Sequence, residues 1–462
     1  MQSIWREMGA REICSAPRLY TLQRGNDNAH VVSHVDDGLV TQDSMDTAKY
    51  IIEKLREAFG GEHSVKVQFS PESYKAMSLA YGPGVVTMRV TQMAVDVVAR
   101  RAPQLLSQPR ISAMPRAAER LIQELRDFVR PSPLPPLTKE QKNAQQWIGE
   151  VKYLDTIILH VKYVVHELTR HMAYPPMPTS TQLLTYCSHL LLSAADEGIT
   201  YGGSSVHAQL PLEVHAHSLD PSLAPTPLEL SDLVELTEFD SDEAAAIAAE
   251  RGLSPAARVW AKINCPMALR PQVAPDLDSG AGPLLEGQCD ATWQTPPTKS
   301  VSGMIVTLFG AAILVNVTCI PAVMHSSFNA ELYAAVQLAH RIVSLRLGCT
   351  EIGLRLVAPT DVWGDNSAVI ALSKPGSMPA RSKGDARRIG ILQDYVRDAE
   401  LRVGKIHTKL NASDYLGKLV EAEKFVRTMK FLTNSAHSIP AKVSLQEMIA
   451  VAVAMTAAQN SP

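Results

Sequence analysis

The spacing of apolar and polar residues divides the chain into segments of different character. From Gln141 to about Gly202 an apolar residue recurs every three or four positions, which predicts a layer of helices. In the first 125 residues, short runs such as HVVSHVDDGLV and YGPGVVTMRV predict strands, and MDTAKYIIEKLREAFG predicts a helix. Strand-like and helical segments alternate again from Gly287 to about Val420, as expected of an α/β domain.

The most apolar stretch of the chain runs from Met304 to Met324. It is long enough to suit a membrane span, but a glycine, an asparagine and a proline interrupt it, and it is rich in Ile, Val and Thr. These features favour two buried strands joined by a turn at Phe309-Gly310. We therefore expect no membrane partner.

Composition and charge place the chain among ordinary globular proteins. Its 462 residues suffice for two or three domains, and the net charge of -3 argues against a surface that is basic throughout. The six cysteines are scattered without a C-x-x-C pair, which argues against a zinc ribbon or a disulfide framework. The first twenty residues lack the apolar core of a secretory signal. We expect a cytoplasmic or nuclear protein that is not secreted.

Breaks in composition predict five parts. The proline-rich stretch RPSPLPPLTKE follows the first mixed segment, and eight acids without any Lys or Arg lie between Glu229 and Glu250. Such acidic segments, rich in Pro, Ser and Ala, are typical of solvated linkers. The expected parts are a mixed segment (1–125), a helical segment (126–202), a linker or insertion (203–285), an α/β domain (286–425) and a C-terminal tail (426–462).

Four carboxylates of the last domain each begin or end a predicted element, where side chains can converge. Asp290 lies in QCDATW, Glu331 opens the predicted helix ELYAAVQLAHRIVSLRLG, Asp365 ends a strand-like run, and Asp414 lies in NASDYLGK. Each one alone is more simply interpreted as a helix cap or as an acid favoured by the helix dipole. Taken singly, these residues leave the structural and the functional interpretation open.

Six segments, in order, resemble the RNase H domain of copia-type retrotransposons. CDATW is similar to that family's S-D-A-D-W strand, SVSGMIVTLFG to its S-G-Y-V-F-F-L-G hairpin, and HSSFNAELYAA to S-S-T-E-A-E-Y. WGDNSAVIAL is similar to C-D-N-Q-S-A-I-A-L, and PARSKGDARRIGILQDYVRD to the stretch around R-T-K-H-I-D-I-R-Y-H-F-V-R. IHTKLNASDYLGK resembles V-P-T-K-E-N-V-A-D-L-L-T-K in its spacing.

The resemblance implies an RNase H-like mixed sheet with flanking helices and a site of four acids. The implied metal ligands are Asp290, Glu331, Asp365 and Asp414. Such a site holds two divalent ions about 4 Å apart and cleaves the RNA strand of an RNA:DNA hybrid. Mg²⁺ suits hard oxygen ligands that leave room for water and a phosphate.

Two positions depart from the family's pattern, and a third could contribute to the implied reaction. The second Asp of D-A-D-W is Thr292, and the His of T-K-H-I-D is Gly384. His407, shortly before Asp414, could assist product release, although a polar surface residue is the simpler interpretation. All four implied ligand positions nevertheless remain acidic.

The positively charged residues that could bind nucleic acid are concentrated near the C-terminal end of this domain. Between Lys374 and Lys430, thirteen Lys and Arg residues face seven Asp and Glu residues, a local charge of +6. A hybrid is recognised mainly through its phosphates and 2′-hydroxyl groups. A solvated basic helix face is the competing interpretation for any single residue. The candidates for phosphate contact are Arg381, Lys383, Arg387 and Arg388.

The N-terminal half resembles the end of a copia-type reverse transcriptase. The sequence HVDD, which predicts a hairpin with Asp-Asp-Gly at its turn, resembles the family's Y-V-D-D motif with His34 in place of tyrosine. QQWIGEVKYLDTIILHVKYVVHELTRHMAYP resembles a later segment of the same enzyme. The resemblance implies a partial palm (1–125) carrying the metal ligands Asp36 and Asp37, and a helical thumb or connection (126–202).

The implied polymerase is incomplete, because the family's third catalytic aspartate comes from a strand upstream of Asp36. We expect that this chain alone cannot polymerise DNA and that other Pol segments would have to supply the missing half. A decayed retroelement fragment without activity, at most binding nucleic acid, is the alternative to an active nuclease.

Two histidine motifs are not expected to bind zinc: His166 and His171 are one residue too far apart, and His215 and His217 lack partners.

Overall fold

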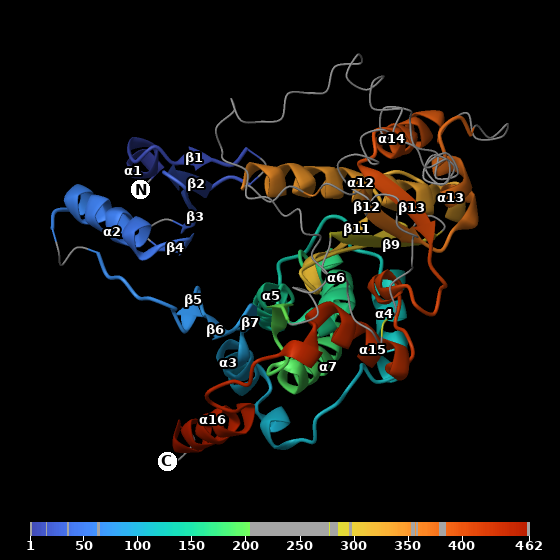
Figure 1. Ribbon diagram of the computed structural model, residues 1–462. Coiled ribbons are helices and arrows are strands. Elements are labelled where there is room, and N and C mark those ends of the chain that lie inside the picture. Colours follow the sequence, from blue (N-terminus) through green and yellow to red (C-terminus); the bar gives the residue numbers. More distant parts are fainter. Residues whose placement is uncertain are drawn as a thin grey trace.

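The computed structural model describes residues 2–14, 16–34, 37–61, 65–203, 277, 285–294, 298–352, 356, 359–377 and 385–459. These residues form a mixed α/β structure with three sheets (Figure 1), which confirms the α/β class expected from the sequence. The linker predicted at 203–285 falls almost wholly outside the described residues. Leu277 is an exception, and its side chain is 3% exposed within the main core.

The first sheet is an antiparallel meander in the order β1-β2-β3-β4. One helix precedes the meander in the sequence and another follows it, and both contribute to a small core around Trp5 and Tyr20. The rings of Trp5 and Tyr20 stack with their centroids 6.4 Å apart. The predicted helix α2 is confirmed: Ser44 caps its start, and Gly60 ends it at φ 90°. The elements are α1 (Gln2–Glu7), β1 (Arg11–Glu12), β2 (Leu19–Arg24), β3 (Asp27–His34), β4 (Asp37–Gln42) and α2 (Met45–Phe59).

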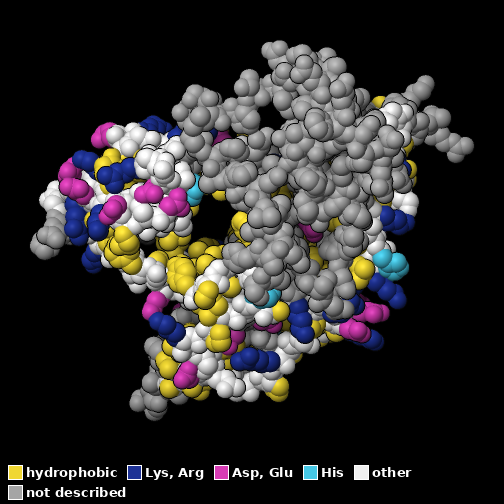
Figure 2. Space-filling model, in the orientation of Figure 1, with side chains coloured by type: hydrophobic (Ala, Val, Ile, Leu, Met, Phe, Trp, Pro, Cys, Tyr) yellow, Lys and Arg dark blue, Asp and Glu magenta, His cyan; other side chains and the backbone are white. Residues whose placement is uncertain are grey.

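The second sheet joins two segments that lie far apart in sequence. Its strands are β5 (Ser73–Tyr74), β6 (Met77–Gly82), β7 (Val85–Arg89) and β8 (Ile199–Gly202), paired in that order. The periodicity predicted helix as far as Gly202, and this was wrong for β8, which pairs with β7. All six residues of β6 are half-buried or exposed, and Figure 2 shows hydrophobic side chains gathered on the surface in this region.

A layer of helices follows, as the apolar spacing predicted. The first helix of the predicted segment, α5, begins with a capping box between Thr138 and Gln141. The elements are α3 (Thr91–Arg101), η2 (Pro103–Ser107), α4 (Ala117–Asp127), α5 (Lys139–Leu154), η3 (Leu159–Val161), α6 (Lys162–Arg170) and α7 (Thr179–Ala194).

The third sheet has five strands in the order β11-β10-β9-β12-β13. The first three strands are antiparallel, whereas β12 is parallel to both β9 and β13. The predicted hairpin is confirmed, with Phe309 and Gly310 at φ 53° and 82° in its turn. The elements are β9 (Glu286–Thr292), β10 (Val301–Leu308), β11 (Ala311–Cys319), α12 (Ser327–Glu351), β12 (Thr360–Gly364), α13 (Ser367–Ser373), α14 (Ala386–Arg397), β13 (Leu401–Lys405) and η8 (Ala412–Leu416).

Strand β10 is buried on both faces, because helices cover both sides of this sheet. Met304 and Val306 join the core formed with α12, while Val301 and Ile305 join the core formed with the helical layer. Figure 1 shows α12 and α14 on one side of the sheet and α6 with α15 on the other. Burial on both faces explains why the apolar residues of β10 do not alternate with exposed polar ones. Within the described ranges, no helix has both the length and the apolar character needed to cross a membrane.

The C-terminal segment folds back onto the first half of the chain. It consists of α15 (Ala422–Thr433), η9 (Ser435–His437) and α16 (Leu445–Gln459). Helix α16 packs against α3 and η2. Asn434, at φ 51°, donates hydrogen bonds to the carbonyl oxygens of Thr200 and Gly202, each 3.0 Å away. The end of the chain therefore stabilises the edge strand β8.

Candidate metal centre

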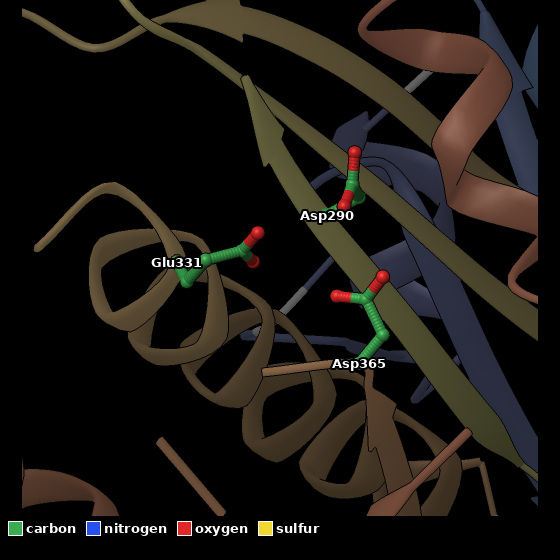
Figure 3. Close-up of side chains that lie close together, drawn as sticks. All are labelled: Asp290, Glu331 and Asp365. Carbon is green, nitrogen blue, oxygen red and sulfur yellow. The ribbon is translucent and has the colours of Figure 1, made fainter. Parts of the chain in front are cut away.

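Three of the four predicted carboxylates converge at one edge of the five-stranded sheet. One oxygen of each of Asp290, Glu331 and Asp365 lies within 4.8 Å of the others. Figure 3 shows the three side chains pointing toward one another from β9, α12 and the end of β12. The arrangement offers a cation three hard oxygen ligands.

The register of two parallel strands explains why the two aspartates meet. Trp363 of β12 pairs with Gln288 of β9, so Asp365 and Asp290 each lie two residues farther toward the carboxyl end. Helix α12 packs on β9 and adds Glu331 from its second turn. The helix begins at Ser327, capped by Ser326, so the expectation that Glu331 opens it was wrong by one turn.

Burial and mutual repulsion keep protons on this cluster when no cation neutralises it. The Asp290 side chain is 8% exposed; burial, with the nearby charges of Asp414 and Asp365, raises its pKa to about 7. Burial and the charges of Asp290 and Asp365 raise the pKa of Glu331 to about 9. A divalent cation would favour the ionised carboxylates, and an all-oxygen donor set suits Mg²⁺. The residues present therefore fit such an ion.

Asp414 lies beside this cluster, but both of its oxygens bind lysines. Lys418 Nζ is 2.5 Å from its Oδ1, and Lys424 Nζ, on α15, is 2.7 Å from its Oδ2. The η8 segment that carries Asp414 is fixed on β9 by two hydrogen bonds. Asn411 Nδ2 donates to the Cys289 carbonyl at 3.3 Å, and the Ala412 amide donates to Gln288 Oε1 at 2.7 Å.

Sequence reasoning did not single out three residues that support the acids. The Thr408 hydroxyl donates to Asp365 Oδ2 at 3.0 Å, and the Thr408 carbonyl accepts from Lys424 at 2.7 Å. Thr408 and Lys418 occupy the positions of the T and the last K in the motif that IHTKLNASDYLGK resembles, so a signal for both was present. Lys424 lies beyond that segment, and only the packing of α15 brings it to Asp414.

The predicted phosphate contacts are only partly described. Arg387 of α14 is exposed to solvent. Arg388 pairs with Asp385 at 3.2 Å, and its guanidinium lies 5.7 Å from the centre of the Tyr333 ring. Arg388 is thus held by two neighbouring side chains, those of Asp385 and Tyr333. Arg381 and Lys383 lie outside the described residues, as does Gly384.

The predicted hairpin around the aspartate pair is confirmed as the antiparallel strands β3 and β4. Strand β3 ends at His34, which pairs with Asp37 at the start of β4. The expectation that Asp37 and Gly38 lie in the turn was wrong, because both residues belong to β4. Asp36 and the side chain of Asp37 lie outside the described residues.

The histidines singled out in the sequence lie in separate environments. His166 Nε2 is 3.7 Å from Cys319 Sγ, whereas the His171 ring packs edge-on against Phe128. His407 is exposed, and its Nδ1 accepts a hydrogen bond from the Lys409 amide at 3.2 Å. His215 and His217 lie outside the described residues.

Comparison with known proteins finds one partial sequence relative. No family model matches the chain. The retrovirus-related Pol polyprotein from transposon TNT 1-94 of Nicotiana tabacum is 32% identical over 148 residues, which are 32% of this chain. The match spans only 11% of that polyprotein. It confirms that this chain resembles a retrotransposon Pol polyprotein.

Three solved structures are similar to a part of the chain. LC11-RNase H1, isolated from compost, covers 29% of this chain with 92% of its own, at 14% identity and a TM-score of 0.25. The same enzyme in complex with an RNA/DNA hybrid gives 15% identity and a TM-score of 0.23, with 29% and 92% coverage. RNase H1 from the archaeon Halobacterium salinarum NRC-1 gives 12% identity, 28% and 89% coverage, and a TM-score of 0.22.

Proposed function

We propose that this chain is a retrotransposon-derived ribonuclease H that hydrolyses the RNA strand of RNA:DNA hybrids. The observation that carries the proposal is the convergence of Asp290, Glu331 and Asp365 to within 4.8 Å of one another. These acids come from a strand, a helix and the end of a second strand, in the order of the RNase H segments that the sequence resembles. The similarity to a Pol polyprotein supports the same origin.

The acids would hold divalent ions, with Mg²⁺ the natural choice. Asp290, Glu331 and Asp365 would bind one ion, and Asp414 would join Asp290 at a second. When bound, two such ions supply an activated water and stabilise the leaving 3′-oxygen. The protein's own part is to hold its carboxylates in register on β9 and β12, where a bound ion would favour their ionised form. Thr408 contributes by orienting the Asp365 carboxylate.

Basic residues beside the acids would bind the phosphates of the hybrid. The segment from Lys374 to Lys430 carries a net charge of +6. A ribonuclease of this kind needs no base-specific contact, because phosphates and 2′-hydroxyl groups identify a hybrid. Exposed Arg387 is the best-placed described candidate, and we extend the proposal to Arg381, Lys383 and Arg388.

For the N-terminal half we propose a reverse transcriptase remnant without polymerase activity of its own. Residues 1–125 would be the partial palm with Asp36 and Asp37, and 126–202 the thumb or connection. The polymerase would need a further carboxylate from another Pol segment. Primer extension by the purified protein on a poly(rA) template would overturn this part of the proposal and leave the nuclease untouched.

A substrate panel tests the nuclease. The purified chain is incubated with Mg²⁺ and labelled RNA presented as a hybrid with DNA, as a duplex with RNA, or alone. We expect cleavage of the hybrid only, and its loss when EDTA removes the metal. Absence of hybrid cleavage by folded protein, with either Mg²⁺ or Mn²⁺, would favour the alternative of a decayed retroelement fragment.

A further inference from the structure

Asp414 differs from the other three acids in its partners. Its side chain is 6% exposed, and each oxygen meets an ammonium group: Lys418 at 2.5 Å and Lys424 at 2.7 Å. Two ammonium groups together carry the charge of one divalent ion. A buried carboxylate is costly unless paired, and these lysines provide the pairing.

The two lysines reach Asp414 from different elements. Lys418 follows the η8 turn and is 55% exposed, whereas Lys424 projects from α15 and is 17% exposed. Lys424 also donates to the Thr408 carbonyl at 2.7 Å, so its position is fixed by two acceptors. This is a built contact on folded elements, not a chance pairing of two flexible surface chains.

The paired lysines stand next to the three-acid cluster. A Cβ atom added to Gly417 would lie 3.7 Å from Asp290 Oδ2, so the backbone just before Lys418 runs along that carboxylate. Thr408, which holds Lys424, also donates to Asp365. Any ion shared by Asp290 and Asp414 would therefore compete directly with the ammonium groups for Asp414.

We propose that Lys418 and Lys424 take the place of a second divalent ion at Asp414 in the protein free of nucleic acid. The protein then binds one divalent ion, at Asp290, Glu331 and Asp365. This inference rests on the proposed function only in assigning that three-acid site to a metal. Each lysine blocks a different oxygen of Asp414, so an ion can bind one of these oxygens only after its ammonium group leaves, and removing both lysines frees the whole carboxylate.

Counting bound Mn²⁺ by isothermal titration calorimetry, without nucleic acid, tests the proposal. We expect one ion in the wild type and two in the Lys418→Met/Lys424→Met double variant, where Asp414 is freed. Adding Asp414→Asn to the double variant should return the count to one. Lys430→Met, an exposed lysine on the same helix α15, should leave the count at one.

Two ions in the wild type, or one in the double variant, would overturn the proposal. If neither protein bound an ion, both the proposal and the assignment of a metal to the three-acid site would fail. The hybrid-cleavage assay would then show whether the proposed nuclease function fails as well. Should the double variant fail to fold, Lys418→Met alone removes the more exposed lysine. It should then show a second, weaker Mn²⁺ site, and its absence would count against the proposal.

Discussion

The Thr408 hydroxyl donates a hydrogen bond to Asp365 Oδ2 across 3.0 Å, which links the loop after β13 to the acid that follows β12. Asp365 is a loop residue beyond the last strand pair, so its carboxylate depends on such a contact for orientation. Outer hydrogen bonds of this kind are expected to hold metal ligands in place. The relationship makes Thr408 part of the candidate centre although it would not touch the metal.

Thr408→Val should weaken metal binding. Losing an outer hydrogen bond typically lowers metal affinity by about tenfold or more. Mn²⁺ titration should therefore give an affinity lower by about tenfold, while the melting temperature of the metal-free protein stays close to that of the wild type. Thr408→Ser keeps the hydroxyl and should bind as the wild type does. Equal affinity in all three proteins would remove Thr408 from the centre.

The metal-free protein should lose stability as the pH rises. Burial raises the pKa of Asp290 to about 7 and that of Glu331 to about 9, whereas both groups ionise near about pH 4 in an unfolded chain. The folded protein therefore holds protons that the unfolded chain has released. The resulting stability is present below about pH 4 and is lost as the pH rises through the folded values.

Thermal melting in EDTA from about pH 5 to about pH 9 measures this effect. The Asp290→Asn/Glu331→Gln variant, which has no such protons to lose, should show a flatter profile. Mg²⁺ should raise the wild-type melting temperature most at the alkaline end, where the carboxylates are ionised. A wild-type profile in EDTA as flat as that of the variant would contradict the buried cluster.

Gly303→Ala should disturb the position of Asp414. Gly303 lies opposite Asp290 on β10, and a Cβ atom there would come within 2.7 Å of Leu416 Cβ and 3.2 Å of the Ser413 carbonyl. Overpacking of this kind costs about 1–3 kcal/mol of unfolding free energy. Gly390→Ala, where α14 has open space, should instead stabilise by about 0.5–1 kcal/mol. Chemical denaturation measures the unfolding free energy of both variants. Equal changes in the two variants would contradict the packing of η8 on β10.

Arg402→Met should destabilise the parallel edge of the sheet. Arg402 on β13 makes two hydrogen bonds of 2.7 Å to Asp361 on β12, with side chains 4% and 2% exposed. Removing one partner of a buried ion pair costs about 3–5 kcal/mol. Arg397→Met breaks a pair with Asp394 whose side chains are 50% and 56% exposed, and should cost less than about 1 kcal/mol. Urea denaturation measures the unfolding free energy of both variants. Similar losses of unfolding free energy in the two would contradict the register of β12 and β13.

Local sequence signals predicted local structure well. The turn at Phe309-Gly310 was predictable because two apolar strands meet at a glycine, and α2 because an amphipathic run ends in Gly60. The start of α12 was missed by one turn, although Ser326 belongs to a residue type favoured at the N-cap of a helix. The acids themselves were recognised through motif order, since an isolated Asp or Glu carries no such signal.

Contacts between distant segments could not be predicted from the pattern. Strand β8 was hidden in a helical run because its partner, β7, lies more than a hundred residues earlier. The packing of α16 on α3 likewise joins the C-terminal helix to a helix in the first half of the chain, so the local pattern of the tail gave no sign of this contact. The pairing of Lys424 with Asp414 also depends on the packing of a helix, α15, which the local pattern does not predict. The five-part division of the chain stays a prediction.

The most direct measurement compares the wild type with Asp290→Asn on an RNA:DNA hybrid whose RNA strand is end-labelled, in the presence of Mg²⁺. Asp398→Asn, an exposed acid at the end of α14, serves as the matched control. The account predicts cleavage by the wild type and the control, and a loss of at least about a hundredfold in Asp290→Asn, as for removal of a group that stabilises the transition state. Equal cleavage by all three proteins would contradict it and assign the activity to a contaminating nuclease.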